Sequence, residues 1–102
     1  MSVPLESSIT RSIVLLAKSL GWWTFKIAGG PMQTAGIPDL LLVKHGRAVF
    51  MEVKRPGKSA SPLQAARIDA IRAVGGAVAE VVTSKAQAGE ILASCEQEHQ
   101  RG

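Results

Sequence analysis

Apolar residues near the start of the chain recur at the spacing of a helix that buries one side. Five of them lie three or four positions apart: Leu5, Ile9, Ile13, Leu16 and Leu20. This spacing is typical of an amphipathic α-helix, and the Gly21 that follows is a common helix end. The pattern therefore predicts a first helix over residues 5–20.

A β-hairpin is predicted in the middle of the chain. Residues 22–27 are aromatic and β-prone, and a glycine-rich loop, residues 28–36, follows them. The apolar runs 37–43 and 48–54 then predict two paired strands, because a turn signal, residues 44–47, separates them. The loop glycines would let the backbone approach a phosphate, although a plain flexible connection is the simpler explanation.

Capping signals mark the start of a second helix. Ser61 is followed by Pro62, the favoured first helical residue, and Gln64 lies at the position of the capping-box partner. The helix is expected to stop at the glycine pair 75–76. The valine-rich residues 77–83 then predict a fourth strand.

A last helix completes the predicted fold. Ser84 caps a helix that is expected to end near Cys95, and the polar residues 96–102 are expected to fray. The order αβββαβα describes an α/β fold, a mixed central sheet flanked by helices. A chain of 102 residues is long enough for one core, so a single domain over residues 1–102 is expected.

The register of the predicted hairpin brings two acids together. If residues 45–46 form a two-residue turn, Asp39 lies directly across from Glu52. Opposed Cβ atoms are roughly 4.5–5.5 Å apart, where like charges destabilise each other. Lys54 falls on the same face, two residues along the strand. A hard cation with oxygen ligands, Mg²⁺ or Mn²⁺, explains two acids and a lysine on an otherwise apolar hairpin.

A structural explanation stays open for each of these residues taken singly. Glu52 and Lys54 are able to form an ion pair at a solvated sheet edge. Asp39 is able to support a turn after Pro38. The three residues together, followed by a basic loop, favour the metal site.

The charge of the chain suits a polyanionic partner but does not require one. Twelve Lys and Arg against eight Asp and Glu give a net charge of +4 and a pI near 9.7. Lys26, Arg55 and Lys58 flank the predicted site and are candidates for contacts with backbone phosphates. Each is equally explained as a solvated surface charge.

Cysteine usage and hydropathy bear on location. Cys95 is the only cysteine, so no internal disulfide is possible, and a buried, inert thiol is expected. The first apolar stretch is interrupted by charged residues, which excludes a signal-peptide core or a membrane span. A cytoplasmic protein of a bacterial or phage-infected cell, with no membrane partner, is expected.

Three motifs in a fixed order resemble a nuclease family. They are G-I-P-D ending at Asp39, E-V-K beginning at Glu52, and S-P-L-Q ending at Gln64. Together they resemble the PD-(D/E)xK pattern and, in this order, its VRR-NUC family (virus-type replication-repair nucleases). The resemblance runs from Glu6 to about Ser84. The combination is far more specific than an isolated E-x-K, and it implies a restriction-endonuclease-like fold.

The resemblance implies a role for each motif residue. Asp39, Glu52 and the backbone carbonyl of Val53 would bind the Mg²⁺ or Mn²⁺ ion. Lys54 would assist the attacking water, and Gln64 would join the catalytic set. Since nearby carboxylates favour a charged lysine, orienting water and stabilising negative charge is the role expected of Lys54. A capping box alone also explains Gln64.

Glu6 resembles the first-helix acid of the family, which makes it a further candidate metal ligand. Its spacing from Ile9 and Ile13 places it on the inward edge of the helix stripe, where an unpaired carboxylate is costly. A favourable charge in the first turn of a helix explains it equally well.

Two aromatic and two imidazole side chains have simpler explanations than a site. Trp22 and Trp23 are able to stack on bases, but packing in the core or in a dimer is the better explanation. His45 and His99 have no ligand partners at a useful spacing and are expected at the surface.

The motifs predict a metal-dependent endonuclease that hydrolyses phosphodiester bonds in DNA. Stand-alone members of this size resemble Holliday-junction resolvases, which implies a homodimer acting on branched or four-way-junction DNA. One alternative is a non-catalytic DNA-binding module with the same fold. Another is a metal-free protein-interaction domain whose positive charge is incidental.

Overall fold

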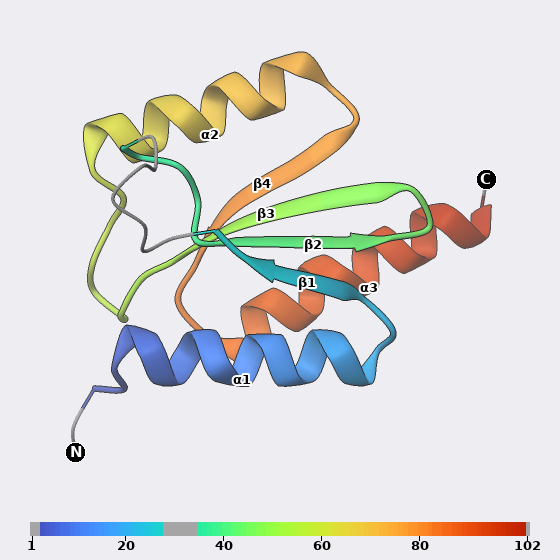
Figure 1. Ribbon diagram of the computed structural model, residues 1–102, viewed down its shortest axis with the longest axis horizontal. Helices are drawn as coiled ribbons and strands as arrows, with labels where there is room; N and C mark the ends of the chain where they lie inside the picture. The colour runs from blue at the N-terminus through green and yellow to red at the C-terminus, as the bar shows by residue number, and fades with distance from the viewer. Residues whose placement is uncertain (1–2, 28–34, 102) are drawn as a thin grey trace.

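Residues 3–27 and 35–101, which the computed structural model describes, form a four-stranded sheet and three helices (Figure 1). Their order along the chain is αβββαβα, as predicted. The elements are α1 (Glu6–Ser19), β1 (Trp23–Lys26), β2 (Leu40–Lys44), β3 (Arg47–Val53), α2 (Pro62–Val74), β4 (Ala77–Val82) and α3 (Lys85–Arg101). The suggested approach of the glycine-rich loop to a phosphate falls largely on residues 28–34, which lie outside the described residues.

The sheet is mixed, with the strand order β1-β2-β3-β4. β2 pairs with β1 and with β3 in the antiparallel direction, and β4 runs parallel to β3. In Figure 1, α1 and α3 lie together on one face of the sheet, and α2 lies over β4 on the other face. The main core fills the space between the sheet and the α1–α3 layer. Its fully buried apolar side chains include Ile13, Leu40, Leu42, Val49, Met51, Val53, Val82 and Leu92.

The turn between β2 and β3 fixes how these two strands pair. His45 and Gly46 both have a positive φ, 52° and 73°, which is the backbone geometry of a two-residue type I′ turn. Lys44 pairs with Arg47, and the pairing continues without a bulge to the start of β2. The predicted hairpin register is therefore confirmed.

The segment before β2 packs against α2. β2 begins at Leu40, three residues later than predicted, and Pro38 has no N–H with which to continue a strand ladder. Gly36 has a φ of +81°, and a Cβ at this position would lie 2.7 Å from the Cγ of Leu63. Only glycine fits this approach of loop to helix, which sets the path of the chain into Asp39.

The end of α3 corrects one prediction. The helix was expected to end near Cys95 and residues 96–102 to fray, but it continues to Arg101. The added turns are held against the β2–β3 turn by long-range contacts that the local sequence does not reveal. These are the ion pairs Lys44–Glu96 and Arg47–Glu98 and the stacked rings of His45 and His99.

The two tryptophans have different environments. Trp22 is buried in the core, as expected for core packing. Trp23 is 56% exposed, and its ring stacks on that of Phe25 with centroids 5.8 Å apart. In the described part of the chain, no helix has the length and apolar content needed to cross a membrane.

Candidate functional site

The predicted acid pair lies where β2 begins and β3 ends. Leu40 pairs with Met51, so Asp39 and Glu52 are the next opposed positions of the same two strands. Met51 and Val53 are fully buried in the core. Because side chains alternate between the faces of a strand, Glu52 is directed to the opposite face, the one that carries α2.

Glu52 is a buried carboxylate with one oxygen left unpaired. Its side chain is 3% exposed, and its Oε2 accepts a hydrogen bond of 2.9 Å from the Nε2 of Gln64. The Nζ of Lys54 lies 3.6 Å from the same oxygen. The Oε1 is buried and has no hydrogen-bond partner among the described residues. Such an arrangement is costly unless a cation satisfies the second oxygen.

The pKa of Glu52 is raised from 4.5 to about 7. Burial is the main cause, because it disfavours the charged carboxylate, and the neighbouring Asp39 carboxylate adds repulsion. Lys54 acts in the opposite direction and lowers this pKa. Asp39 is therefore close enough to raise the pKa of Glu52, as expected for the register that places the two acids opposite each other.

Asp39 is held by bonds to both neighbouring strands. Its Oδ2 accepts a hydrogen bond of 2.9 Å from the backbone N–H of Val53, and its own carbonyl accepts one of 2.7 Å from the N–H of Ile27. Because β2 begins only at Leu40, Val53 has no backbone partner on that strand, and the Asp39 carboxylate accepts its N–H instead. In a strand, the N–H and C=O of one residue point to the same side. The carbonyl of Val53 is thus directed to the side where Asp39 lies.

Lys54, the residue after β3, and Gln64, in the first turn of α2, complete the cluster. The backbone N–H of Lys54 donates to the carbonyl of Val82, which anchors the residue to β4, and its side chain is 17% exposed. Gln64 forms the predicted capping box: its Oε1 accepts from the N–H of Ser61, and its own N–H donates to the Ser61 hydroxyl. Its Nε2 is then free to bind Glu52. Both explanations of Gln64 apply at once.

Glu6 does not have the environment that its spacing predicted. It was expected on the inward edge of the helix stripe, but its side chain is exposed in the first turn of α1. Favourable charge at a helix N-terminus explains this position. Within residues 3–27 and 35–101, no three Asp, Glu, His or Cys side chains are grouped to hold a metal ion. The structure therefore brings Asp39 and Glu52 together but does not add Glu6 to them.

The three flanking cations have different positions. Lys26, at the end of β1, and Lys58, in the loop after β3, are exposed. The guanidinium of Arg55 donates to the carbonyl of Val3 at 3.5 Å. This contact places the segment before α1 beside the loop that follows β3.

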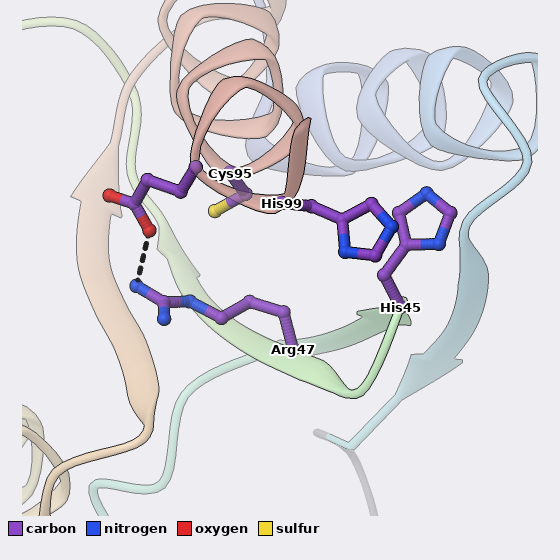
Figure 2. Close-up of a pocket in the computed structure, with 5 residues that line it drawn as sticks. His45, Arg47, Cys95 and His99 are labelled. Carbon is purple, nitrogen blue, oxygen red and sulfur yellow. Dashed lines mark ion pairs between the residues drawn. The ribbon is translucent and has the colours of Figure 1, made fainter. Parts of the chain in front are cut away.

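A second polar cluster lies at the other end of the hairpin (Figure 2). His45, Arg47, Cys95, Glu98 and His99 line a cavity of about 160 Å³. The two imidazole rings stack with centroids 3.8 Å apart, and Arg47 pairs with Glu98 at 2.9 Å. Both histidines are exposed, as expected, but nothing local in the sequence signals the contact between their rings. Burial raises the pKa of the Cys95 thiol, which keeps it protonated and inert.

Comparisons with known proteins agree with the predicted fold. Neither a family model nor a curated protein matches this sequence. A solved structure titled "VRR_NUC domain" matches with a TM-score of 0.73 and 26% sequence identity. The match covers 85% of this chain and 92% of that one. This likeness confirms the restriction-endonuclease-like fold, and it agrees with the resemblance to the VRR-NUC family that the motifs carry.

Proposed function

We propose that this protein is a metal-dependent endonuclease that hydrolyses phosphodiester bonds in DNA. The observation that carries the proposal is the buried carboxylate of Glu52, which has one unpaired oxygen and lies beside Asp39 and Lys54. The likeness to a VRR_NUC domain supports a nuclease-type function. The net charge of +4 suits a DNA substrate.

The residues present fit a hard divalent cation. Asp39, Glu52 and the carbonyl of Val53 offer oxygen atoms, the donors that Mg²⁺ and Mn²⁺ prefer. Mg²⁺ commonly uses one or two carboxylates together with the phosphates of its substrate. Glu6 stays a candidate for a further ligand, but this set does not require it.

Each residue of the cluster has a distinct proposed task. A bound Mg²⁺ or Mn²⁺ ion supplies positive charge that polarises the scissile phosphate and makes water easier to deprotonate. Gln64 holds the Oε2 of Glu52, which would leave the Oε1 available to the ion. The ammonium of Lys54 orients the attacking water and stabilises the negative charge that develops on the phosphate.

Removing the acid pair or the lysine tests the activity. We expect D39N, E52Q and K54A each to lower DNA cleavage at least about 100-fold, because D39N and E52Q lose a charge that would hold the cation and K54A loses one that acts on the reacting phosphate. The matched controls E90Q and K18A change exposed residues outside the site and should cleave like wild type. Cleavage is measured with Mn²⁺ on duplex, flap, single-stranded and four-way-junction DNA, and circular dichroism verifies folding.

Two results would contradict this assignment. An active D39A/E52A double variant would end the claim that these residues are catalytic. Binding of DNA in Ca²⁺ without cleavage in Mn²⁺ would instead identify a non-catalytic DNA-binding module.

The raised pKa of Glu52 predicts how stability depends on pH without metal. The folded carboxyl keeps its proton up to about pH 7, whereas the unfolded one loses it near 4.5. The contribution of Glu52 to stability is therefore complete below pH 4.5 and is lost as pH rises through 7. A shift of this size corresponds to roughly 3 kcal/mol.

Urea unfolding at pH 5 and pH 8 in chelator checks this dependence. The free energy of unfolding of wild type should fall between the two pH values. E52Q should fall much less, and E90Q should follow wild type. Adding Mn²⁺ at pH 8 should restore stability to wild type but not to E52Q. An identical pH profile for E52Q and wild type would rule out this account of Glu52.

Gln64 and Ser61 form a matched pair of variants. Both Q64A and S61A lose the capping box, and each should lower the free energy of unfolding by about 1 kcal/mol. Only Q64A also frees Glu52, so it alone should lower cleavage and raise the Mn²⁺ concentration for half-maximal activity, each by about tenfold or more. Equal effects of the two variants on the Mn²⁺ requirement would show that Gln64 acts through the helix cap alone.

A homodimer that acts on four-way junctions is the finer part of the proposal. Trp23 and Phe25 are 56% and 52% exposed on the edge strand β1, on the part of the sheet that α2 does not cover (Figure 1). We infer that a second copy of the chain covers this stacked aromatic pair. Two joined copies would present two active sites, one for each strand to be cut.

Sedimentation equilibrium at micromolar concentration tests the dimer. We expect wild type to be dimeric and W23S/F25S to be monomeric, because the change removes both aromatic rings from the proposed contact. V74S, which alters another exposed apolar residue on α2, should remain dimeric. Wild type that is monomeric throughout would remove the dimer from the proposal without affecting the single active site.

A further inference from the structure

A basic groove separate from the acid pair runs between α1 and the edge strand β1. It has a volume of about 360 Å³ and is lined by Ser7, Thr10, Arg11, Val14, Leu15 and Lys26. No acidic side chain lines it. The lining therefore combines two positive charges, two hydroxyl groups and an apolar wall.

The two cations of the groove are not neutralised by acids. In residues 3–27 and 35–101, Lys44, Arg47, Lys54 and Arg72 form ion pairs with carboxylates, but Arg11 and Lys26 do not. The remaining positions of the sequence, residues 1–2, 28–34 and 102, contain no Asp or Glu. The positive charge of the groove is thus available to an anion from outside the chain.

The apolar part of the groove is also unusual. Leu15 is 63% exposed, although it lies next to the two cations on the wall of a cavity. A free inorganic anion gains nothing from such a side chain. A phosphodiester does, because a sugar carbon framework lies next to each charged phosphate.

The groove lies at the same end of the sheet as the acid pair. Lys26 pairs with Leu40, the residue after Asp39, and the N–H of the adjacent Ile27 donates to the carbonyl of Asp39. Lys26 shares a face with its buried partner Leu40, the face that carries α1, whereas Glu52 faces α2. The groove and the acid pair therefore lie at one end of the sheet but on its two opposite faces.

We propose that this groove binds a backbone phosphate of the DNA away from the scissile bond. The guanidinium of Arg11 and the ammonium of Lys26 hold the phosphate oxygens, since charge-assisted hydrogen bonds to phosphate are the strong ones. The hydroxyls of Ser7 and Thr10 add neutral donors, and Leu15 contacts the sugar. This inference rests on the proposed function and names the part of the chain that positions its substrate.

DNA binding in Ca²⁺, which separates binding from cleavage, tests the groove. The variant R11Q/K26Q is compared with K18Q/R101Q, which removes the same charge from the distant ends of α1 and α3. Binding is measured between 50 and 200 mM salt. We expect R11Q/K26Q to bind DNA at least about tenfold more weakly than wild type. The slope of log affinity against log salt concentration should be smaller in magnitude by about one to two. K18Q/R101Q should resemble wild type.

Cleavage at saturating DNA separates this inference from the activity itself. R11Q/K26Q should lose much less in cleavage rate at saturating DNA than in affinity, because the acid pair is intact. If both double variants lose affinity and salt dependence equally, the groove is not a specific phosphate site, although the nuclease proposal stands. If wild type neither binds nor cleaves DNA, both proposals fail.

Two further ligands identify the source of the phosphate. Inorganic phosphate at constant ionic strength should compete with DNA only weakly, because it lacks the sugar that contacts Leu15. Strong competition would assign the groove to a free anion and overturn the proposal. Vesicles containing phosphatidylglycerol should not bind; binding that R11Q/K26Q abolishes, with DNA affinity unchanged, would assign the groove to a lipid surface instead.

Discussion

Because His45 and Gly46 both adopt positive φ, the β2–β3 turn permits one pairing of its strands, and the geometry of the site follows from that pairing. A slip of one residue would send Glu52 into the core and Met51 out of it, since neighbouring side chains occupy opposite faces. The fully buried Met51 and Val53 therefore stabilise the register that places Glu52 opposite Asp39. The apolar core and the acid pair depend on the same alternation.

This arrangement buries Glu52, and burial disfavours the charged form of its carboxyl group. The helix α2 limits that cost through Gln64, which serves the helix cap and the carboxylate together. One side chain thus both caps the start of α2 and fixes the position of the Glu52 carboxylate. The unpaired oxygen of this buried carboxylate is the feature from which we propose a bound cation.

Most of the fold could be predicted because its signals are local. The capping box at Ser61, the turn at His45 and Gly46 and the alternation along β3 each involve residues a few positions apart. Asp39 and Glu52 are also linked by a short hairpin, so counting residues from the turn sufficed to pair them. Only the resemblance to the VRR-NUC family placed Gln64 among the site residues, because the capping box by itself is a sufficient reason for a glutamine at this position.

The errors concern contacts between distant parts of the chain. The length of α3 depends on ion pairs with the β2–β3 turn, about fifty residues away, and its polar composition gave no sign of them. Glu6 was placed inward from a periodicity that cannot define the edge of a helix stripe to within one residue. The groove of Arg11 and Lys26 likewise exists only because α1 packs beside β1.

Gly36 gives the first letter of the G-x-P-D motif a meaning of its own. It takes no part in the chemistry, yet the nearby Leu63 of α2 leaves no space for a side chain there. The glycine is therefore required by the close approach of the loop to the helix. A search for the G-x-P-D motif would consequently select chains in which this loop packs closely on the following helix, as well as chains that carry the aspartate. Chains that keep the aspartate but replace the glycine should have that helix farther from the loop.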